Sequence, residues 1–207
     1  MQSNICGVVV SHSATHNRVD MVDESWQTGL LGGVEKTRIH LVDYNAGWPS
    51  KFRTHAARIA AALGAVALRV EHIGSTSVPG LAAKPIIDIL VVVQDSSEES
   101  AYLPPLERAG YVLRVREPHW HEHRMFRTPE RDVHIHVYSA GCPEIQRNLI
   151  FRDRLRTNAE DRQRYEQTRR ELATKDWSDM NEYAAAKTDV IESIIAAAEA
   201  RDAISAA

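Results

Sequence analysis

A single carboxylate stands inside an apolar run, "IIDILVVV" (86–93), in which Asp88 is the only charged side chain. A buried, ionised carboxylate costs several kcal/mol unless it is hydrogen-bonded, paired with a cation or bound to a metal. Two interpretations follow for Asp88. It accepts hydrogen bonds from the loop that precedes it, or it binds Mg²⁺ beside a nucleotide, because Mg²⁺ prefers hard oxygen ligands.

The loop before this carboxylate, "GSTSVPGLAAKP" (74–85), has a composition suited to phosphate. Its glycines adopt backbone conformations closed to other residues, and three hydroxyls stand beside a row of backbone N–H groups. The residues concerned are Gly74, Ser75, Thr76, Ser77 and Gly80. The same residues could make a tight connection between two strands. Neither a Walker A motif nor GxGxxG is present to decide between these two interpretations, phosphate binding and a strand connection.

Two histidines alternate along "VHIHVY" (133–138), so His134 and His136 project from one face of the expected strand. Imidazoles favour Zn, Mn, Fe or Ni over Mg, so the two histidines with Asp88 would hold a transition metal. A general base is a second role, because histidine titrates near neutrality. The third interpretation is that one histidine packs in the sheet and the other faces solvent.

A hairpin is expected before this strand, with its turn centred on 129–130. That register would place His123 opposite His136, and a slip of one residue would break the alignment. The segment "HWHEH" (119–123) is interpreted as a solvated loop, and His72 as a hydrogen-bonding strut rather than a catalyst. These assignments leave Asp88, His134 and His136 as the candidate catalytic and metal-binding residues.

Three basic residues in the C-terminal third are weaker candidates for binding a phosphate or an acidic substrate. Arg152 and Arg156 lie one helical turn apart on one face. Lys187, in "YAAAKTDV", would reach the same ligand from the last helix. A surface salt bridge is the simpler interpretation of each.

The pattern of elements around these residues predicts an α/β or α+β fold with a mixed sheet. Apolar spacing predicts a helix from Pro49 to Gly64, and β-branched runs bounded by turn residues predict strands. The expected strands are 65–73, 86–93, 111–115, 123–128 and 133–138. The segment 39–44 is expected as a short strand or an extended entry, and a further helix runs from Ser96 or Ser97 to about Ala109. From Pro143 to about Ala200 the pattern is helical, with breaks near Asn158 and "KDWSDMNEY".

Length and composition suit one domain with a helical C-terminal segment. The chain has 207 residues, a net charge of −3 and 43% hydrophobic residues, which allows a substantial core. We expect a poorly ordered extension at 1–35, a core at 36–142 and C-terminal helices at 143–207 that pack on it. The near-neutral charge gives no signal for nucleic acid or an anionic membrane. No apolar run approaches the roughly 18 residues that span a bilayer, and two isolated cysteines, Cys6 and Cys142, fit a reducing cytoplasm.

The loop and the strand together resemble a known family. A glycine–serine loop followed by a strand bearing a central Asp is a signature of nucleotidyltransferases with the DNA polymerase β-like fold. The longer string "EHIGSTSVPGLAAKPIID", with "HIHV" (134–137) and "FRDRLR" (151–156) downstream, is similar to the GrpB family, UPF0157, over roughly residues 38–198. The resemblance implies a nucleotidyltransferase-like mixed β-sheet flanked by helices.

The resemblance also implies a ligand set and a reaction. It places Gly74 and Ser75 at the phosphates of ATP or another nucleoside triphosphate, with Ser77 and Lys84 nearby. It places Asp88 on a divalent metal, Mg or Mn or a transition metal, for nucleotidyl transfer to a small-molecule acceptor. Active members usually carry a second carboxylate two residues later, where this chain has Leu90. The alternatives are therefore a nucleotide- or metabolite-binding module without catalysis, or an ATP-dependent ligase that forms amides through an adenylate.

Overall fold

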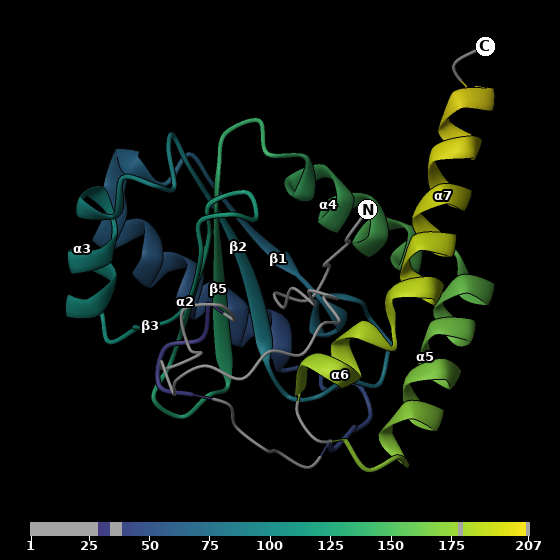
Figure 1. Ribbon diagram of the computed structural model, residues 1–207. Coiled ribbons are helices and arrows are strands. Elements are labelled where there is room, and N and C mark those ends of the chain that lie inside the picture. Colours follow the sequence, from purple (N-terminus) through teal and green to yellow (C-terminus); the bar gives the residue numbers. More distant parts are fainter. Residues whose placement is uncertain (1–28, 34–38, 178–179, 206–207) are drawn as a thin grey trace, which may run out of the picture.

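The protein is described by a computed structural model that covers residues 29–33, 39–177 and 180–205 (Figure 1). Most of the expected N-terminal extension, 1–35, lies outside these residues. Its described part, 29–33, runs along the edge of the sheet. Leu30 pairs antiparallel with Val115, and the Leu31 N–H donates to the Arg114 carbonyl at 2.9 Å. This short segment therefore covers the last strand of the sheet.

Five strands form one mixed sheet in the order β1-β2-β5-β4-β3. Strands β2 and β5 are parallel neighbours at the centre, and every other pair is antiparallel. The strands are β1 (Arg69–Ile73), β2 (Ile87–Val93), β3 (Val112–Glu117), β4 (His123–Arg127) and β5 (Val133–Ser139). The predicted mixed α+β class, with helices on a mixed sheet, is confirmed.

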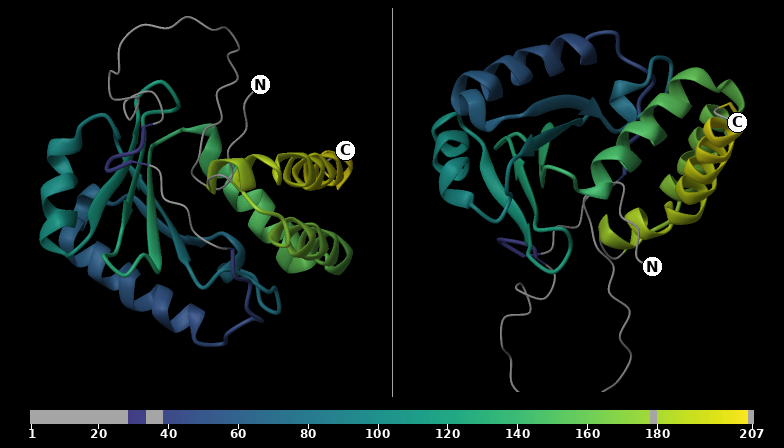
Figure 2. Two further views of the ribbon diagram at one scale, coloured as in Figure 1. Left: turned by 60° about the horizontal axis from the view of Figure 1, so that its bottom comes forward. Right: turned by 90° about the horizontal axis from the view of Figure 1, so that it is seen from above.

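One face of the sheet is covered by α2 (Trp48–Leu63) and α3 (Leu103–Arg108) (Figures 1 and 2). Alternate residues of β2 and β5, including Ile89 and Ile135, point into this fully buried layer and meet Ile59 of α2. Helix α2 has a proline in its first turn and ends at Gly64, whose φ of 53° suits glycine. The predicted limits of this helix are therefore confirmed.

The second face of the sheet is partly covered by α4 (Pro143–Thr157), and α5 (Ala159–Ala173), α6 (Met180–Ala185) and α7 (Thr188–Ser205) lie beyond it (Figure 2). The break between α4 and α5 falls at Asn158, as predicted. Its side chain accepts a hydrogen bond from the Asp161 N–H at 2.8 Å and so caps α5. The C-terminal segment is thus helical up to Ser205.

Several element limits differ from those predicted. The 65–73 segment begins with a 3₁₀ turn, η1 (Gly64–Val66), before β1 starts. The predicted helix from 96 to 109 is a 3₁₀ turn, η3 (Glu99–Ala101), followed by α3, because two adjacent prolines suit only the first turn of a helix. The predicted strand at 39–44 is reduced to a single bridge between Val42 and Ala83. Strand β3 continues to Glu117, two residues beyond its predicted end.

The β4–β5 hairpin has a register two residues away from the predicted one. Met125, not His123, lies opposite His136. The turn is shifted because the Thr128 hydroxyl accepts the Asp132 N–H at 3.2 Å, and Arg131 adopts a positive φ of 61°. Since a shift of two residues preserves the alternation of side chains, His123 still points to the same face as His136.

Candidate functional site

Three potential metal ligands meet at the centre of the second face. Asp88 on β2 lies directly opposite His134 on the parallel strand β5, and His136 projects from the same face two residues later. The Asp88 Oδ1 is 3.6 Å from the His134 Nδ1 and 3.7 Å from the His136 Nε2. One ligand atom from each of the three side chains lies within 4.8 Å of the other two. The three residues predicted as metal ligands are therefore adjacent.

The contacts of Asp88 with the two imidazoles are longer than hydrogen bonds and close to the separation of two ligands on one metal ion. A hydrogen bond requires N···O distances of about 2.7–3.2 Å, which both contacts exceed. Ligands about 2.0–2.1 Å from a tetrahedral metal lie roughly 3.4 Å from one another. One carboxylate and two imidazoles also form a donor set used by catalytic zinc and non-haem iron sites. The three side chains can thus hold a divalent transition-metal ion.

The charge state of Asp88 suits this role. Burial alone would raise the pKa of its carboxyl, but the facing imidazoles of His134 and His136 hold that pKa well below its usual range. The carboxylate is therefore ionised at neutral pH. The Asp88 and His134 side chains keep 20% and 24% of their surface exposed, whereas His136 keeps 6%. A ligand can reach the set from the side of Asp88 and His134.

The loop predicted to bind phosphate touches the carboxylate. Gly74 has φ 67° and ψ −176°, a conformation open essentially to glycine alone, and a 3₁₀ turn, η2 (Ser75–Ser77), follows it. A Cβ placed on Gly74 would lie 2.3 Å from the Asp88 Oδ2. The absence of a side chain at residue 74 thus lets the loop backbone lie directly against Asp88.

The three hydroxyls of this loop have different environments. The Ser77 hydroxyl donates to the Gly74 carbonyl at 2.6 Å, and the Thr76 hydroxyl donates to the Ile86 carbonyl at 3.0 Å. Both side chains are buried. The Ser75 hydroxyl is partly exposed and makes no hydrogen bond within the described part of the chain. Among the three predicted contacts to phosphate, Ser75 is the one whose hydroxyl can turn to a ligand.

The two predicted arginines of α4 bind different segments: Arg156 contacts the loop and Arg152 contacts β1. Arg156 donates two hydrogen bonds to the Ser77 carbonyl, at 3.0 and 2.9 Å. Arg152 donates to a carboxylate oxygen of Glu71 at 2.8 Å and to the His72 carbonyl at 3.2 Å, at the end of β1. Both guanidinium groups therefore bind protein atoms, and their predicted contact with a ligand would be additional to a structural role.

The two predicted lysines meet at one aromatic ring. The Lys187 Nζ lies 4.6 Å, and the Lys84 Nζ 5.9 Å, from the ring centroid of Tyr183 on α6. The phenol oxygen of Tyr183 is buried without a hydrogen-bond partner. Residues distant in the sequence are thus brought to one place, with both ammonium groups near the Tyr183 ring.

His72 is a strut, as predicted. Its Nε2 lies 3.1 Å from the Thr76 hydroxyl oxygen, and its ring stacks on Phe52 at 4.6 Å between centroids. Burial lowers the pKa of His72 to about 4, with Asp88 acting in the opposite direction. A neutral imidazole therefore joins β1 to the loop.

The interpretation of 119–123 as a solvated loop is wrong for its last residue. His123 begins β4, is fully buried and stacks on Tyr138. Its Nε2 is 3.1 Å from the His136 Nδ1, and its Nδ1 is 2.6 Å from a carboxylate oxygen of Glu117. Sequence reasoning missed Glu117 because the predicted strand ended before it. The available signal for His123 was its expected place in the hairpin, on the same face as His136.

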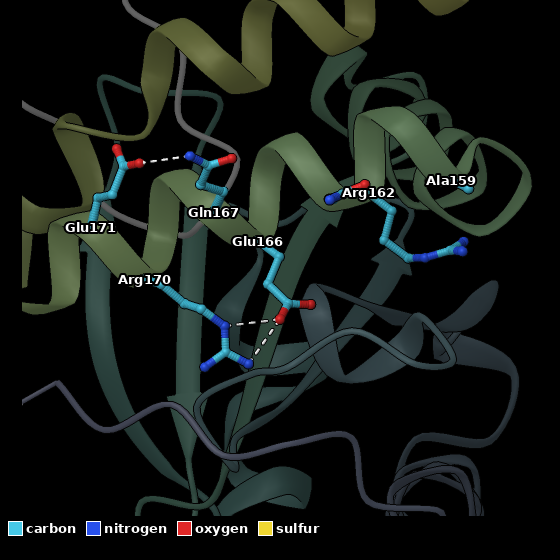
Figure 3. Close-up of a pocket in the computed structure, with 7 residues that line it drawn as sticks. Ala159, Arg162, Glu166, Gln167, Arg170 and Glu171 are labelled. Carbon is cyan, nitrogen blue, oxygen red and sulfur yellow. Dashed lines mark hydrogen bonds and ion pairs between the residues drawn. The ribbon is translucent and has the colours of Figure 1, made fainter.

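A separate cavity of about 460 Å³ is lined by residues of α5 (Figure 3). None of the predicted site residues lines it. Its side chains interact within the helix, where Arg170 forms an ion pair with Glu166 and the Gln167 amide donates a hydrogen bond to Glu171. The lining residues are Ala159, Arg162, Gln163, Glu166, Gln167, Arg170 and Glu171. This surface is a charged helix face distinct from the candidate metal site.

Fold and site together define a mixed α+β domain in which a glycine-bounded loop lies against a two-histidine, one-carboxylate set. Within the described residues, no helix combines the length and apolar character that crossing a membrane requires. Residues 38–197 match the family described as GrpB protein, and the chain belongs to this family. The family resemblance seen in the sequence is therefore confirmed.

Known relatives cover most of the chain. A UPF0157 protein of Halalkalibacterium halodurans is 47% identical over 186 residues, or 89% of this chain and 95% of that protein. The crystal structure of the conserved protein GrpB from Enterococcus faecalis has a TM-score of 0.67 at 33% identity, and the match covers 75% of this chain and 97% of that chain. A dephospho-CoA kinase of Mycobacterium leprae is 31% identical over 176 residues, which is 71% of this chain but 43% of that protein.

Proposed function

We propose that this protein binds a nucleoside triphosphate, ATP in the first instance, beside a divalent metal and transfers its nucleotidyl group to a small-molecule acceptor. The observation that carries the proposal is the contact of Gly74 with Asp88, where a Cβ would come within 2.3 Å of a carboxylate oxygen. A phosphate held by the loop would then lie next to the metal ligands. Phosphoryl chemistry needs that adjacency, because its catalysis is mainly positioning and neutralisation of charge.

Each part of the site has a separate task in this proposal. The loop backbone and the Ser75 hydroxyl donate to phosphate oxygens, and Lys84 and Lys187, which both lie near the Tyr183 ring, are the predicted cationic contacts of the same anion. Asp88, His134 and His136 are the protein ligands of the metal and, in this sense, the catalytic set. A divalent ion bound there would act as a Lewis acid toward the phosphoryl oxygens. Arg156 keeps the loop in place through the Ser77 carbonyl.

The composition of the ligand set favours a transition metal over magnesium. The position two residues after Asp88, where a second carboxylate would be expected, is Leu90, which is fully buried beside Ile145 and Leu149 of α4. His134 and His136 on the neighbouring strand supply the remaining ligands instead. Since imidazole binds Mn²⁺ or Zn²⁺ more readily than Mg²⁺, we expect the first two ions to support nucleotide binding best.

Leu90 also favours a second candidate function. Two-metal transfer needs several carboxylates around both ions, and a buried leucine leaves a single one. A nucleotide- or metabolite-binding module without turnover is therefore the alternative. Release of pyrophosphate from ATP in the presence of candidate acceptors supports the transferase. Tight ATP binding without pyrophosphate release supports the module.

The test is metal-dependent nucleotide binding by Asp88→Asn. Loss of the carboxylate ligand should abolish the rise in Tm that ATP with Mn²⁺ produces in the wild-type protein. Asp43→Asn, which alters an exposed carboxylate paired with Arg170, serves as the matched control and should keep the full rise. Ser75→Ala should weaken ATP binding and leave metal binding intact. An Asp88→Asn protein with an undiminished rise would refute the proposal.

A further inference from the structure

A line of polar side chains crosses the second face of the sheet from its centre to its edge. Four neighbouring strands, in the order β2, β5, β4 and β3, each contribute one residue. These are Asp88, His136, His123 and Glu117. The contacts along the line are 3.7 Å from Asp88 to the His136 Nε2, 3.1 Å between the two histidines and 2.6 Å from His123 to Glu117.

The three residues of this line beyond Asp88 are shielded from water. His123 is fully buried, and His136 and Glu117 keep less than a tenth of their surface exposed. The rings of Trp120 and Tyr138 pack on His123 at centroid distances of 5.4 and 4.8 Å. Buried polar groups of this kind persist only where each has a partner, because an unpaired one costs the free energy of its desolvation.

The edge segment contributes to this enclosure. Gly29 has a φ of 67°, and its backbone carbonyl accepts a hydrogen bond from the Arg116 N–H at 2.8 Å. A Cβ at Gly29 would lie 2.8 Å from the Cγ of Glu117. A residue with a side chain could not pass so close to Glu117. The glycine therefore allows the segment to cover the carboxylate that ends the line.

The positions of the hydrogens along the line follow from the carboxylate of Glu117. A carboxylate accepts only, so the Nδ1 of His123, 2.6 Å away, must carry a hydrogen. A neutral imidazole carries one hydrogen, so with that hydrogen on Nδ1 the Nε2 of His123 is an acceptor. The Nδ1 of His136 must then donate to that acceptor. The Nε2 of His136 is then left without a hydrogen opposite the Asp88 carboxylate, and a metal ion between these two acceptors would bind both.

We infer that Glu117 and His123 are positioning residues that fix a hydrogen on the Nδ1 of His136 and so aim its Nε2 at the metal. This inference rests on the metal site of the proposed function. A carboxylate–histidine chain behind a ligand orients the ring and raises its basicity, and loss of such a partner typically weakens metal binding about 10–100-fold.

The informative substitution is Glu117→Gln, which keeps the shape of the side chain. A glutamine amide can donate to the Nδ1 of His123, and the whole line can then reverse its polarity. In the reversed state His136 carries its hydrogen on Nε2, which must leave before a metal binds. We expect Zn²⁺ to bind this variant about 10–100-fold more weakly, as measured by competition with a chromogenic chelator. Glu122→Gln, on a half-exposed carboxylate beside the line, should bind Zn²⁺ like the wild-type protein.

The wild-type protein offers an independent measurement. Long-range ¹H–¹⁵N correlation of its imidazoles, with and without Zn²⁺, should show a hydrogen on the Nδ1 of His136 in both states. A neutral His136 protonated on Nε2 alone would overturn the inference, and so would unchanged Zn²⁺ affinity in a folded Glu117→Gln protein. If Glu117→Gln does not fold, the wild-type spectrum decides. If the wild-type protein binds neither Zn²⁺ nor Mn²⁺, the metal site fails while the spectrum still decides the role of Glu117 and His123.

Discussion

At the scale of single residues, the site depends on two glycines, whose lack of a side chain lets the backbone lie close to neighbouring residues. A Cβ on Gly74 would clash with the carboxylate of Asp88, and a Cβ on Gly29 would clash with the Arg116 carbonyl and the Cγ of Glu117. Both glycines have a positive φ, so a side chain would add backbone strain to a steric clash. The ends of the polar line are thus both fixed by close contact with backbone.

Gly74→Ala tests this contact. The backbone conformation costs about 1–3 kcal/mol for a residue with a side chain, and the new Cβ would displace the Asp88 carboxylate. Gly80→Ala is the matched control, because Gly80 has a φ of 79° but nothing within 4 Å of its virtual Cβ. Urea unfolding should show lower stability for both variants, whereas titration with Zn²⁺ should show weaker binding for Gly74→Ala alone. Equal Zn²⁺ affinities in the two variants would contradict a role for the contact.

At the scale of elements, alternation along strands was predictable and the extent of each strand was not. The apolar run around Asp88 predicted β2, and the segment with the two histidines predicted β5. Because side chains alternate between the two faces of a strand, His134 and His136 were expected on one face. Strand β3 extends to Glu117 because residues 29–33 and β4 both pair with it. Those partners are distant in the sequence. The predicted set therefore contained Asp88, His134 and His136 but missed the two residues behind them.

The N-terminus of α4 illustrates a conflict between local and tertiary effects. Glu144 lies in the first turn, where the helix dipole stabilises an anion by about 0.3–1 kcal/mol. Its side chain is nevertheless buried, and one carboxyl oxygen has no hydrogen-bond partner. Burial raises the pKa of Glu144 to about 7, and nearby Glu192 acts in the same direction, although Arg147 opposes the shift from 3.1 Å. The tertiary environment therefore outweighs the dipole.

This shift predicts a pH-dependent gain in stability for Glu144→Gln. Between the unfolded-state pKa near 4.5 and the folded-state pKa of about 7, the native protein holds a proton that the unfolded chain has lost. The free energy of unfolding contributed by this group therefore falls as the pH rises through that window. At pH 8 the glutamine variant should be more stable than the wild type by on the order of 2–3 kcal/mol, and at pH 4.5 nearly equal to it.

Urea unfolding of both proteins at the two pH values gives this difference directly. Other groups titrate equally in the two proteins and cancel. Glu130→Gln, on an exposed carboxyl, should stay within about 0.5 kcal/mol of the wild type at each pH. A Glu144→Gln protein that is less stable at pH 8 would show that the ion pair with Arg147, and not burial, dominates at this position.

At the scale of the whole molecule, the candidate loop is held between two apolar clusters. The cluster on the first face packs α2 and α3 on the sheet. A second cluster joins the C-terminal helices, and it contains Val78 and Leu81 from the loop itself. The loop is therefore part of the helical segment's core as well as the connection between β1 and β2. The helices from 143 onward and the sheet should behave as one cooperative unit.

A pair of Leu→Ala substitutions tests this cooperativity. Leu155 on α4 lies in the cluster of the C-terminal helices, and Leu106 on α3 lies in the cluster of the first face, both almost fully buried. Each truncation should cost about 2–5 kcal/mol. In a single cooperative unit, either variant shifts one urea transition, and tryptophan fluorescence and far-UV circular dichroism report the same midpoint. If the circular dichroism midpoint of Leu155→Ala instead lies at a lower urea concentration than its fluorescence midpoint, the C-terminal helices unfold before the sheet. The loop then loses its contacts with these helices first.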